Sequence, residues 1–414
     1  MQYAVLFFMR SFIENLPGSR DILQLIFIYG RENNMIIKNG LIHDAVNREP
    51  YIGDIRIVDG KITEIGTSLA VEGDEQIVDA SGVSVYPGFV EAHCHLGLDG
   101  WGIGFEGADY NEPGDICTPH LRSEDSFNPL DPSVHNAAKG GITSVATGQG
   151  SANAIGGTWI AVKTVGNCVD DMIIKTPVAM KCALGENPKR CYRDKGNFAR
   201  MSTASVIRNM MFKAKEYLAK KEKAGDDIFK QPGFDFKCEA MIPVLKKEIP
   251  LKIHAHQAND ILTAIRLAKE FDVNLTIEHV TEGHLIADKL ANCPYPLAVG
   301  PSFTHATKFE LQNKTWETPG ILAAKGCQVS IITDSPVIPQ EYLPLCAGLA
   351  VKAGMDPFEA LKAITINPAK QIGIADRVGS IEVGKDGDIV ITDGDPMVSD
   401  TAVKVVFING VAVE

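Results

Sequence analysis

Four short apolar runs in this chain each end in side chains that bind metal ions. An apolar run of this length between polar residues is typical of a buried strand. Polar groups at the carboxyl ends of strands that alternate with helices are typical of a (β/α)8 barrel, whose active sites lie on that face. The sequence therefore predicts a barrel in which these distant groups converge. The four runs are residues 88–95 (Gly-Phe-Val-Glu-Ala-His-Cys-His), 251–256 (Leu-Lys-Ile-His-Ala-His), 275–279 (Leu-Thr-Ile-Glu-His) and 329–334 (Val-Ser-Ile-Ile-Thr-Asp).

The first run ends in a pair of histidines with metal-binding spacing. His93 and His95 stand at positions i and i+2, so a strand presents both imidazoles on one face. Such a pair alone is weak evidence, and its weight comes from the three other runs. Cys94, between the two histidines, points to the opposite face, and we expect it to fill the core.

The two ends of the chain differ from its middle. Helical patterns are expected in residues 204–222, 257–271 and 356–366, between or after the strand-like runs. Residues 35–86 and the C-terminal segment instead consist of short alternating pieces, with Asp59-Gly60 as a hairpin turn. A chain of 414 residues has room for a barrel of about 250 residues and a smaller second unit.

As a group, the four strand ends resemble those of the metal-dependent amidohydrolases. The resemblance runs from Met35 to the C-terminus, and the imidazolonepropionase-like and prolidase-like branch is the most similar. Residues 184–190 (Leu-Gly-Glu-Asn-Pro-Lys-Arg) and 333–339 (Thr-Asp-Ser-Pro-Val-Ile-Pro) support that branch. The resemblance implies an α/β fold: a (β/α)8 barrel over residues 87–366, and a small β-sandwich that combines residues 35–86 and 367–414.

The resemblance also implies a set of metal ligands. His93, His95 and Asp334 would hold one ion, and His254 and His279 would hold a second if two are present. Imidazoles and carboxylates suit divalent metals, zinc above all. His256 shares its strand face with His254 and is either the ligand in place of His254 or a substrate-binding residue.

The group that bridges two ions is left open. Two-metal relatives use a carboxylate from a Glu or a carbamylated Lys on the fourth strand. Here that strand offers Lys181 and Glu186, and a single-metal site is a third alternative. A Lys inside an apolar strand needs a partner, because burial of an unpaired charge is costly.

The chemistry implied is hydrolysis of a carbon–nitrogen bond by metal-activated water. Asp334 would take the proton of the water and deliver it to the leaving nitrogen, with His279 as a second catalytic residue. Deaminases of this superfamily have a Glu three residues after the histidine of the fifth strand, where this chain has Gln257. That favours amide or cyclic amide hydrolysis over the alternatives: a deaminase, a Xaa-dipeptidase, or, from another class, a metal-free scaffold. Ser335 is a further departure, since His is expected there.

Residues 96–135 are expected to form a long loop beside the histidine pair. They lack periodicity, and loops of more than about 12–15 residues usually serve function. The loop offers Glu106, His120 and Arg122 as substrate contacts. The Gly-rich residues 147–157 lack the Lys-Ser/Thr ending of a phosphate-binding loop, so we expect only a tight turn.

Composition narrows the partners of the chain to small molecules. The formal net charge of −12 gives no basic surface for nucleic acid or anionic membranes. Nine cysteines without a Cys-x-x-Cys pair indicate reduced thiols and a cytoplasmic location. A homo-oligomer is compatible with the sequence. Residues 1–34 fit neither unit and are interpreted as an atypical extension, with no clear signal peptide.

Overall fold

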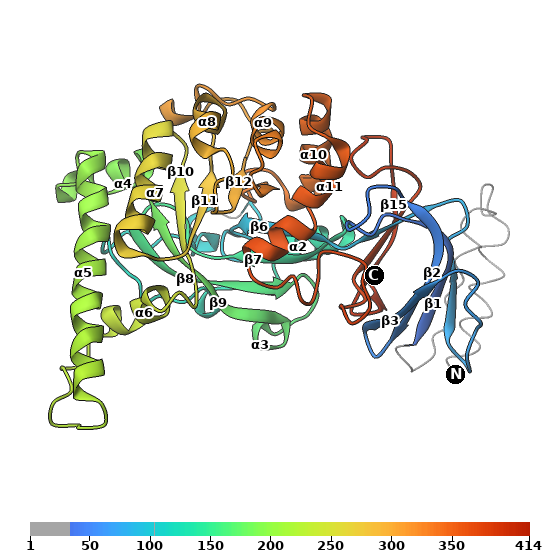
Figure 1. Ribbon diagram of the computed structural model, residues 1–414, viewed down its shortest axis with the longest axis horizontal. Coiled ribbons are helices and arrows are strands. Elements are labelled where there is room, and N and C mark those ends of the chain that lie inside the picture. Colours follow the sequence, from blue (N-terminus) through green and yellow to red (C-terminus); the bar gives the residue numbers. More distant parts are fainter. Residues whose placement is uncertain (1–33, 103) are drawn as a thin grey trace.

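The chain folds around two eight-stranded sheets. The computed structural model describes residues 34–102 and 104–414 (Figure 1). The interpretation of residues 1–34 as an extension therefore falls almost entirely outside the described residues. Among the described residues, every helix is too short or too polar to span a bilayer.

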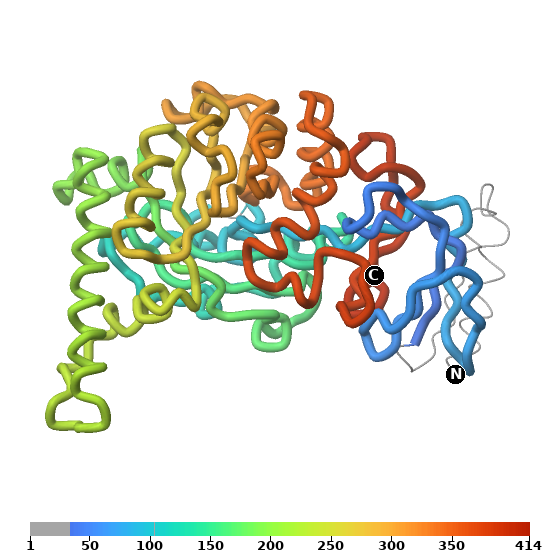
Figure 2. The backbone as a smooth tube through the Cα atoms, in the orientation of Figure 1, coloured from blue at the N-terminus to red at the C-terminus, as the bar shows by residue number. Residues whose placement is uncertain are grey.

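The first sheet combines strands from both ends of the chain. Its order is β16-β15-β14-β5-β1-β2-β3, and β4 pairs in parallel with β1. The antiparallel pairing of β14 with β5 joins the C-terminal segment to the N-terminal one, and Figure 2 shows these two segments side by side. The shared sheet agrees with the expected combination of chain ends, whereas the sandwich and its boundaries stay predictions. The strands are β1 (Met35–Ile42), β2 (Tyr51–Val58), β3 (Lys61–Gly66), β4 (Gln76–Asp79), β5 (Ser84–Pro87), β14 (Ile389–Thr392), β15 (Val403–Ile408) and β16 (Val411–Ala412).

The second sheet is a nearly closed barrel. Its strands follow one another in sequence order from β6 to β13, and the two outer strands, β6 and β13, pack against each other. All of its strands are buried for most of their length. They are β6 (Phe89–Cys94), β7 (Ile142–Thr147), β8 (Ile155–Lys163), β9 (Ile173–Ala183), β10 (Leu251–Ala255), β11 (Leu275–His279), β12 (Leu297–Val299) and β13 (Val329–Ile331).

One strand departs from the (β/α)8 pattern. β8 pairs antiparallel with both β7 and β9, whereas the other neighbouring strands of this sheet pair in parallel. The reason lies in the connections: residues 148–154 contain no helix, and residues 164–172 contain only the short α3. A parallel crossover needs about a dozen residues or more, so these short links return the chain as hairpins.

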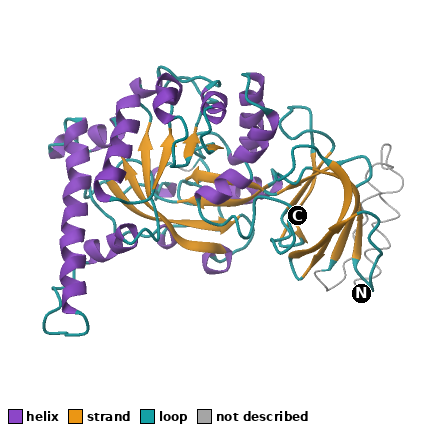
Figure 3. Cartoon of the chain, viewed as in Figure 1, coloured by secondary structure: helices purple, strands orange, loops and turns teal. Residues whose placement is uncertain are grey.

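Helices cover the outside of the barrel sheet (Figure 3). The three expected helical regions are confirmed, since residues 204–222, 257–271 and 356–366 overlap α5, α7 and α11. The helices are α2 (Pro132–Lys139), α3 (Val169–Met172), α4 (Glu186–Cys191), α5 (Arg200–Ala224), α6 (Phe236–Leu245), α7 (Ala258–Phe271), α8 (Ala287–Leu290), α9 (Thr318–Ala324), α10 (Leu343–Lys352), α11 (Pro357–Ala363) and α12 (Ile366–Gln371).

A buried charge cluster joins the two sheets. Lys163, at the end of β8, lies 2.6 Å from Asp388 and 2.9 Å from Asp386, which precede β14. Both carboxylates are also almost fully buried. Burial disfavours their charge unless it is paired, so Lys163 holds the barrel against the terminal sheet.

Candidate metal centre

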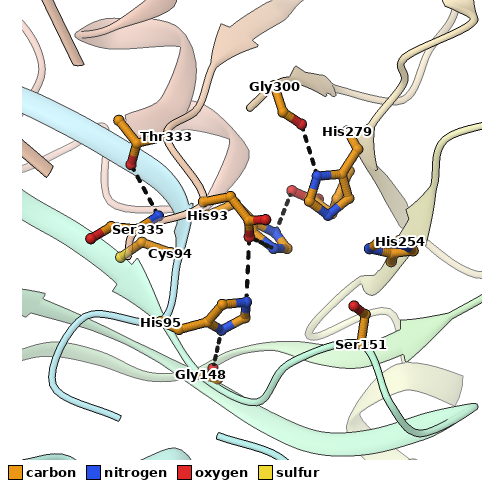
Figure 4. Close-up of polar contacts among 12 residues, drawn as sticks. His93, Cys94, His95, Gly148, Ser151, His254, His279, Gly300, Thr333 and Ser335 are labelled. Carbon is orange, nitrogen blue, oxygen red and sulfur yellow. Dashed lines mark hydrogen bonds and ion pairs between the residues drawn. The ribbon is translucent and has the colours of Figure 1, made fainter. Parts of the chain in front are cut away.

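The carboxyl ends of the barrel strands bring the predicted ligands together. Two groups of side chains place their ligand atoms within 4.8 Å of one another: His93, His279 and Asp334, and His254, His256 and His279. Because His279 belongs to both groups, they form one continuous centre (Figure 4).

Hydrogen bonds fix the orientation of four imidazoles. In each, Nδ1 contacts a neighbouring oxygen, so Nε2 is the nitrogen that remains for a metal ion. Such outer contacts are usual for histidines that bind metal ions. The contacts are His93 with Glu278 (3.0 Å), His95 with the Gly148 carbonyl (2.7 Å), His256 with Thr281 (2.7 Å) and His279 with the Gly300 carbonyl (2.8 Å).

Asp334 faces the histidine pair at the end of β6. Its Oδ1 lies 3.4 Å from Nε2 of both His93 and His95. Burial opposes ionisation of Asp334, but the nearby imidazoles of His279, His93 and His95 outweigh it and hold the pKa of this carboxyl well below its usual range. The group is therefore an anion at neutral pH.

Two of the ligand positions have a left-handed backbone. His279 has φ of 77° and Asp334 has φ of 55°, a region that residues other than Gly seldom adopt. Such a backbone conformation costs about 1–3 kcal/mol per residue and occurs most often at functional sites. His279 is the last residue of β11, and Asp334 stands three residues after the end of β13. Both turns therefore lie at the carboxyl end of the barrel.

The buried imidazoles are neutral. Burial lowers the pKa of His93 to about 4 and that of His279 to about 3, with Lys181 adding to both effects. Burial, with nearby His279, also takes the pKa of His254 and His256 well below the usual value. A neutral imidazole offers a lone pair to a cation.

The same residues fit a divalent metal ion. Within the described part of the chain, the two ring nitrogens of His254 have no hydrogen-bond partner, and Oδ1 of Asp334 has none either. Buried polar atoms nearly always have a partner. Imidazole nitrogens and carboxylate oxygens that face one another are the donors that zinc and similar ions take.

The two candidate bridging residues have different surroundings. Nζ of Lys181, on β9, lies 3.4 Å from Nε2 of His93, and burial lowers the pKa of this amine to about 7. Glu186 begins α4, and its carboxylate accepts a hydrogen bond from the backbone of Glu310 at 3.3 Å. Lys181 thus contacts a histidine of the centre, whereas Glu186 contacts the turn that holds Glu310.

The candidates from the long loop lie apart from the converging ligands. Glu106 is exposed in a short 3₁₀ turn. His120 and Arg122 line a pocket of about 390 Å³ whose other walls include Phe236 of α6 and Pro177 of β9. None of the residues that converge in the two ligand groups lines this pocket. Their substrate-binding role stays a prediction.

Sequence reasoning missed a buried network beneath the ligands. Glu278 is fully buried and lies 3.0 Å from His93 and 2.8 Å from Nζ of Lys252. Its other oxygen accepts a 2.6 Å hydrogen bond from Thr276. Strand alternation was the available signal, because Lys252 stands two residues before His254 and so shares its face.

Trp159 is a second residue that sequence reasoning missed. It is fully buried on β8, with its ring 4.6 Å from that of His93. Nζ of Lys252 lies 4.9 Å and Nζ of Lys181 5.1 Å from the ring centre. A cation over an indole face is stabilised, so Trp159 supports both buried amines.

A family model described as the amidohydrolase family matches residues 84–413 of this chain. The chain belongs to the amidohydrolase family. A solved structure of an amidohydrolase from Thermotoga maritima is 42% identical, with a TM-score of 0.88 over 92% of this chain and 99% of that one.

Two curated relatives extend the comparison. An imidazolonepropionase from a Geobacillus species is 27% identical over 409 residues, 90% of this chain and 91% of the relative. The amidohydrolase tasK of Hapsidospora irregularis is 28% identical over 392 residues, 87% of this chain. This chain spans only 40% of the length of tasK. The family assigns this amidohydrolase to the enzymes that act on carbon–nitrogen bonds of small molecules, typically with a divalent metal.

Proposed function

We propose that this amidohydrolase hydrolyses an amide or cyclic amide bond of a small molecule at a centre of one or two divalent ions, with zinc as the favoured ion. The observation that carries the proposal is the convergence of buried, neutral imidazoles on the ionised Asp334. His93, His95 and Asp334 would hold one ion, and His254 and His279 a second. Lys181 is the nearer candidate for a bridge.

A divalent ion bound here would lower the pKa of a bound water to about 7 and polarise the scissile carbonyl. Asp334 is placed to accept the proton of that water, since its Oδ1 is buried among imidazoles and has no hydrogen-bond partner in the described residues. Its depressed pKa keeps Asp334 ionised, so the carboxylate has a free oxygen for that proton and would pass it on to the leaving nitrogen.

The environment of Gln257 favours amide hydrolysis over deamination. Gln257 caps α7, and its side-chain oxygen accepts a hydrogen bond from Arg200, which also pairs with Asp260. An amide side chain cannot exchange a proton near neutral pH. This position therefore lacks the acid that ring deamination requires, whereas amide hydrolysis needs only Asp334.

The first test combines metal content with substrate class. We expect zinc in the reconstituted enzyme and hydrolysis of lactams, acyl amides or dipeptides, without ammonia release from amino-heterocycles. Asp334→Asn should lower kcat by about 10²–10⁴-fold, while Asp376→Asn, the same change in an exposed carboxylate, leaves kcat unchanged. Protein that takes up no metal, or that only releases ammonia from heterocycles, contradicts the proposal.

The same measurement addresses the bridge. Metal content of Lys181→Ala and Glu186→Ala variants is compared with that of the wild type. Loss of one ion of two in either variant would identify the bridging side chain. One ion in all three proteins would favour a single-metal site. The cytoplasmic location and a homo-oligomer stay predictions for this enzyme.

A further inference from the structure

Glu310 is a buried carboxylate that reaches the metal centre from outside the barrel strands. It lies in the short 3₁₀ turn Phe309–Leu311, on the long connection between β12 and α9. Its side chain is fully buried. A carboxylate is almost never fully buried without a charged partner or a metal ion, so its surroundings decide what it does.

Oε1 of Glu310 faces two of the histidines. It lies 3.5 Å from Nε2 of His254 and 3.7 Å from Nε2 of His256. Oε1 also pairs with Nζ of Lys308 at 2.7 Å, whereas neither ring nitrogen of His254 has a hydrogen-bond partner within the described residues. One carboxylate oxygen and two imidazole nitrogens thus lie close together in a buried place.

These separations match those of ligands around a tetrahedral ion. Zinc binds imidazole nitrogen at about 2.0–2.1 Å and carboxylate oxygen at about 2.0–2.2 Å. Two such ligands at a tetrahedral angle are about 3.4 Å apart, close to the 3.5 and 3.7 Å observed. His279 supplies a third nitrogen within 4.8 Å of the other two.

We infer that His254, His256, His279 and Glu310 together hold one divalent ion. The inference rests on the proposed function, because it concerns the second ion of the same centre. It adds two ligands, His256 and Glu310, to the pair His254 and His279. Four protein ligands make a closed site, whereas a catalytic ion keeps an open position. Water activation then falls to the ion at His93, His95 and Asp334.

The contacts around Glu310 are those expected of a ligating carboxylate. Its second oxygen, Oε2, accepts a 2.9 Å hydrogen bond from the backbone of Glu186. Nζ of Lys308 lies 2.7 Å from Oε1 and also donates to Asn187 at 3.2 Å. A carboxylate that binds metal is usually oriented by such outer partners, and each of its oxygens has lone pairs for two of them.

The charge of Glu310 is also suited to an ion. Nζ of Lys308 at 2.7 Å from Oε1 supplies the charged partner that a buried carboxylate requires. The alternative is a purely structural role, in which Glu310 only pairs with Lys308 and docks the β12–α9 connection.

Zinc stoichiometry and anomalous diffraction separate these two roles. The full chain is stripped with a chelator, reconstituted with zinc chloride and desalted, and zinc per chain is measured with the affinity of each ion. Glu310→Gln keeps the shape and removes the anionic ligand. The matched control is Asp260→Asn, because Asp260 is also a buried carboxylate next to Gly185. A Cβ added to Gly185 would lie 3.2 Å from Asp260 and 2.7 Å from Glu310.

We expect two zinc ions in the wild type and in Asp260→Asn, and one in Glu310→Gln. Loss of an outer contact costs about 10–100-fold in metal affinity, so loss of a ligand should weaken the second ion by more than 100-fold. In crystals of the wild type, anomalous scattering at the zinc edge should place an ion at about 2.0–2.2 Å from Oε1 of Glu310.

Three results would overturn the inference. Two zinc ions of unchanged affinity in Glu310→Gln would assign Glu310 a structural role and leave the proposed function standing. An ion found only beside His93 and His95 would do the same. A wild type that takes up no zinc would overturn the proposed function itself, together with this inference.

Discussion

Replacing Glu278 by Gln should destabilise the enzyme strongly, even without metal. The carboxylate of Glu278 is fully buried and pairs with Lys252 at 2.8 Å. Lys252 has only 2% of its side chain exposed, and its other contacts are the carbonyl of Ala92 at 2.9 Å and the ring of Trp159. The substitution keeps the shape of the side chain but leaves this ammonium buried without an anion.

The expected loss in free energy of unfolding is about 3–5 kcal/mol, the usual effect of removing one partner from a buried ion pair. That is a large part of the roughly 5–15 kcal/mol by which folded proteins are stable. Replacing both partners, as in Lys252→Met with Glu278→Gln, removes the unpaired charge. The double variant should therefore recover most of the stability that the single variant loses.

Urea unfolding of chelator-treated protein, followed by circular dichroism, measures both effects. The control is Glu270→Gln, which breaks a half-exposed pair with Arg208 and should cost less than about 1 kcal/mol. The reasoning is refuted if Glu278→Gln costs no more than this control, or if the double variant is less stable than Glu278→Gln.

Two further predictions concern the ligand support and the sheet junction. Gly300→Ala would place a Cβ at 2.2 Å from the carbonyl of Ile332, displacing the carbonyl that orients His279, and should weaken metal affinity by about 10–100-fold in a zinc titration. At the junction, burial raises the pKa of Asp386, but Lys163 and Lys61 outweigh that effect, so its pKa is lowered. The stability that Asp386 gives the folded enzyme is therefore complete above the unfolded pKa of about 3.9. It is lost as the pH falls through the lower pKa of the folded state. Asp386→Asn should be less stable than wild type at pH 7 in thermal unfolding, and the difference should shrink in acid; a constant difference down to pH 2 would contradict this.

Much of the barrel could be predicted from the sequence because its signals are local. A buried strand and the ligand at its end lie within about six residues, so the runs at 88–95 and 251–256 predict both a strand and a metal ligand. The antiparallel β8 was missed for the opposite reason. Its direction depends on the lengths of two connections rather than on any residue of the strand itself.

The rest of the candidate site depends on contacts between distant segments. Glu278 meets His93 although 185 residues separate them, and Glu310 reaches His254 from a loop without periodicity. No local pattern marks Glu310, and strand alternation alone does not show that Glu278 meets His93. His120 and Arg122 illustrate the converse, because they belong to a loop that starts at the centre yet lie against α6 rather than beside the ligands.

Strand alternation alone would have chosen the wrong residue on β11. His254 pairs in register with Glu278, not with His279, and Glu278 is the residue that contacts His93 of the non-adjacent strand β6. Such a contact requires Glu278 to point into the barrel. His279 follows with the opposite orientation and reaches the centre only because its φ of 77° reverses the backbone. The ligand set therefore combines residues that point inward by alternation with residues turned inward at the end of a strand. The second kind has a strained backbone, which for His279 is stabilised by the contact with the Gly300 carbonyl and by the buried surroundings.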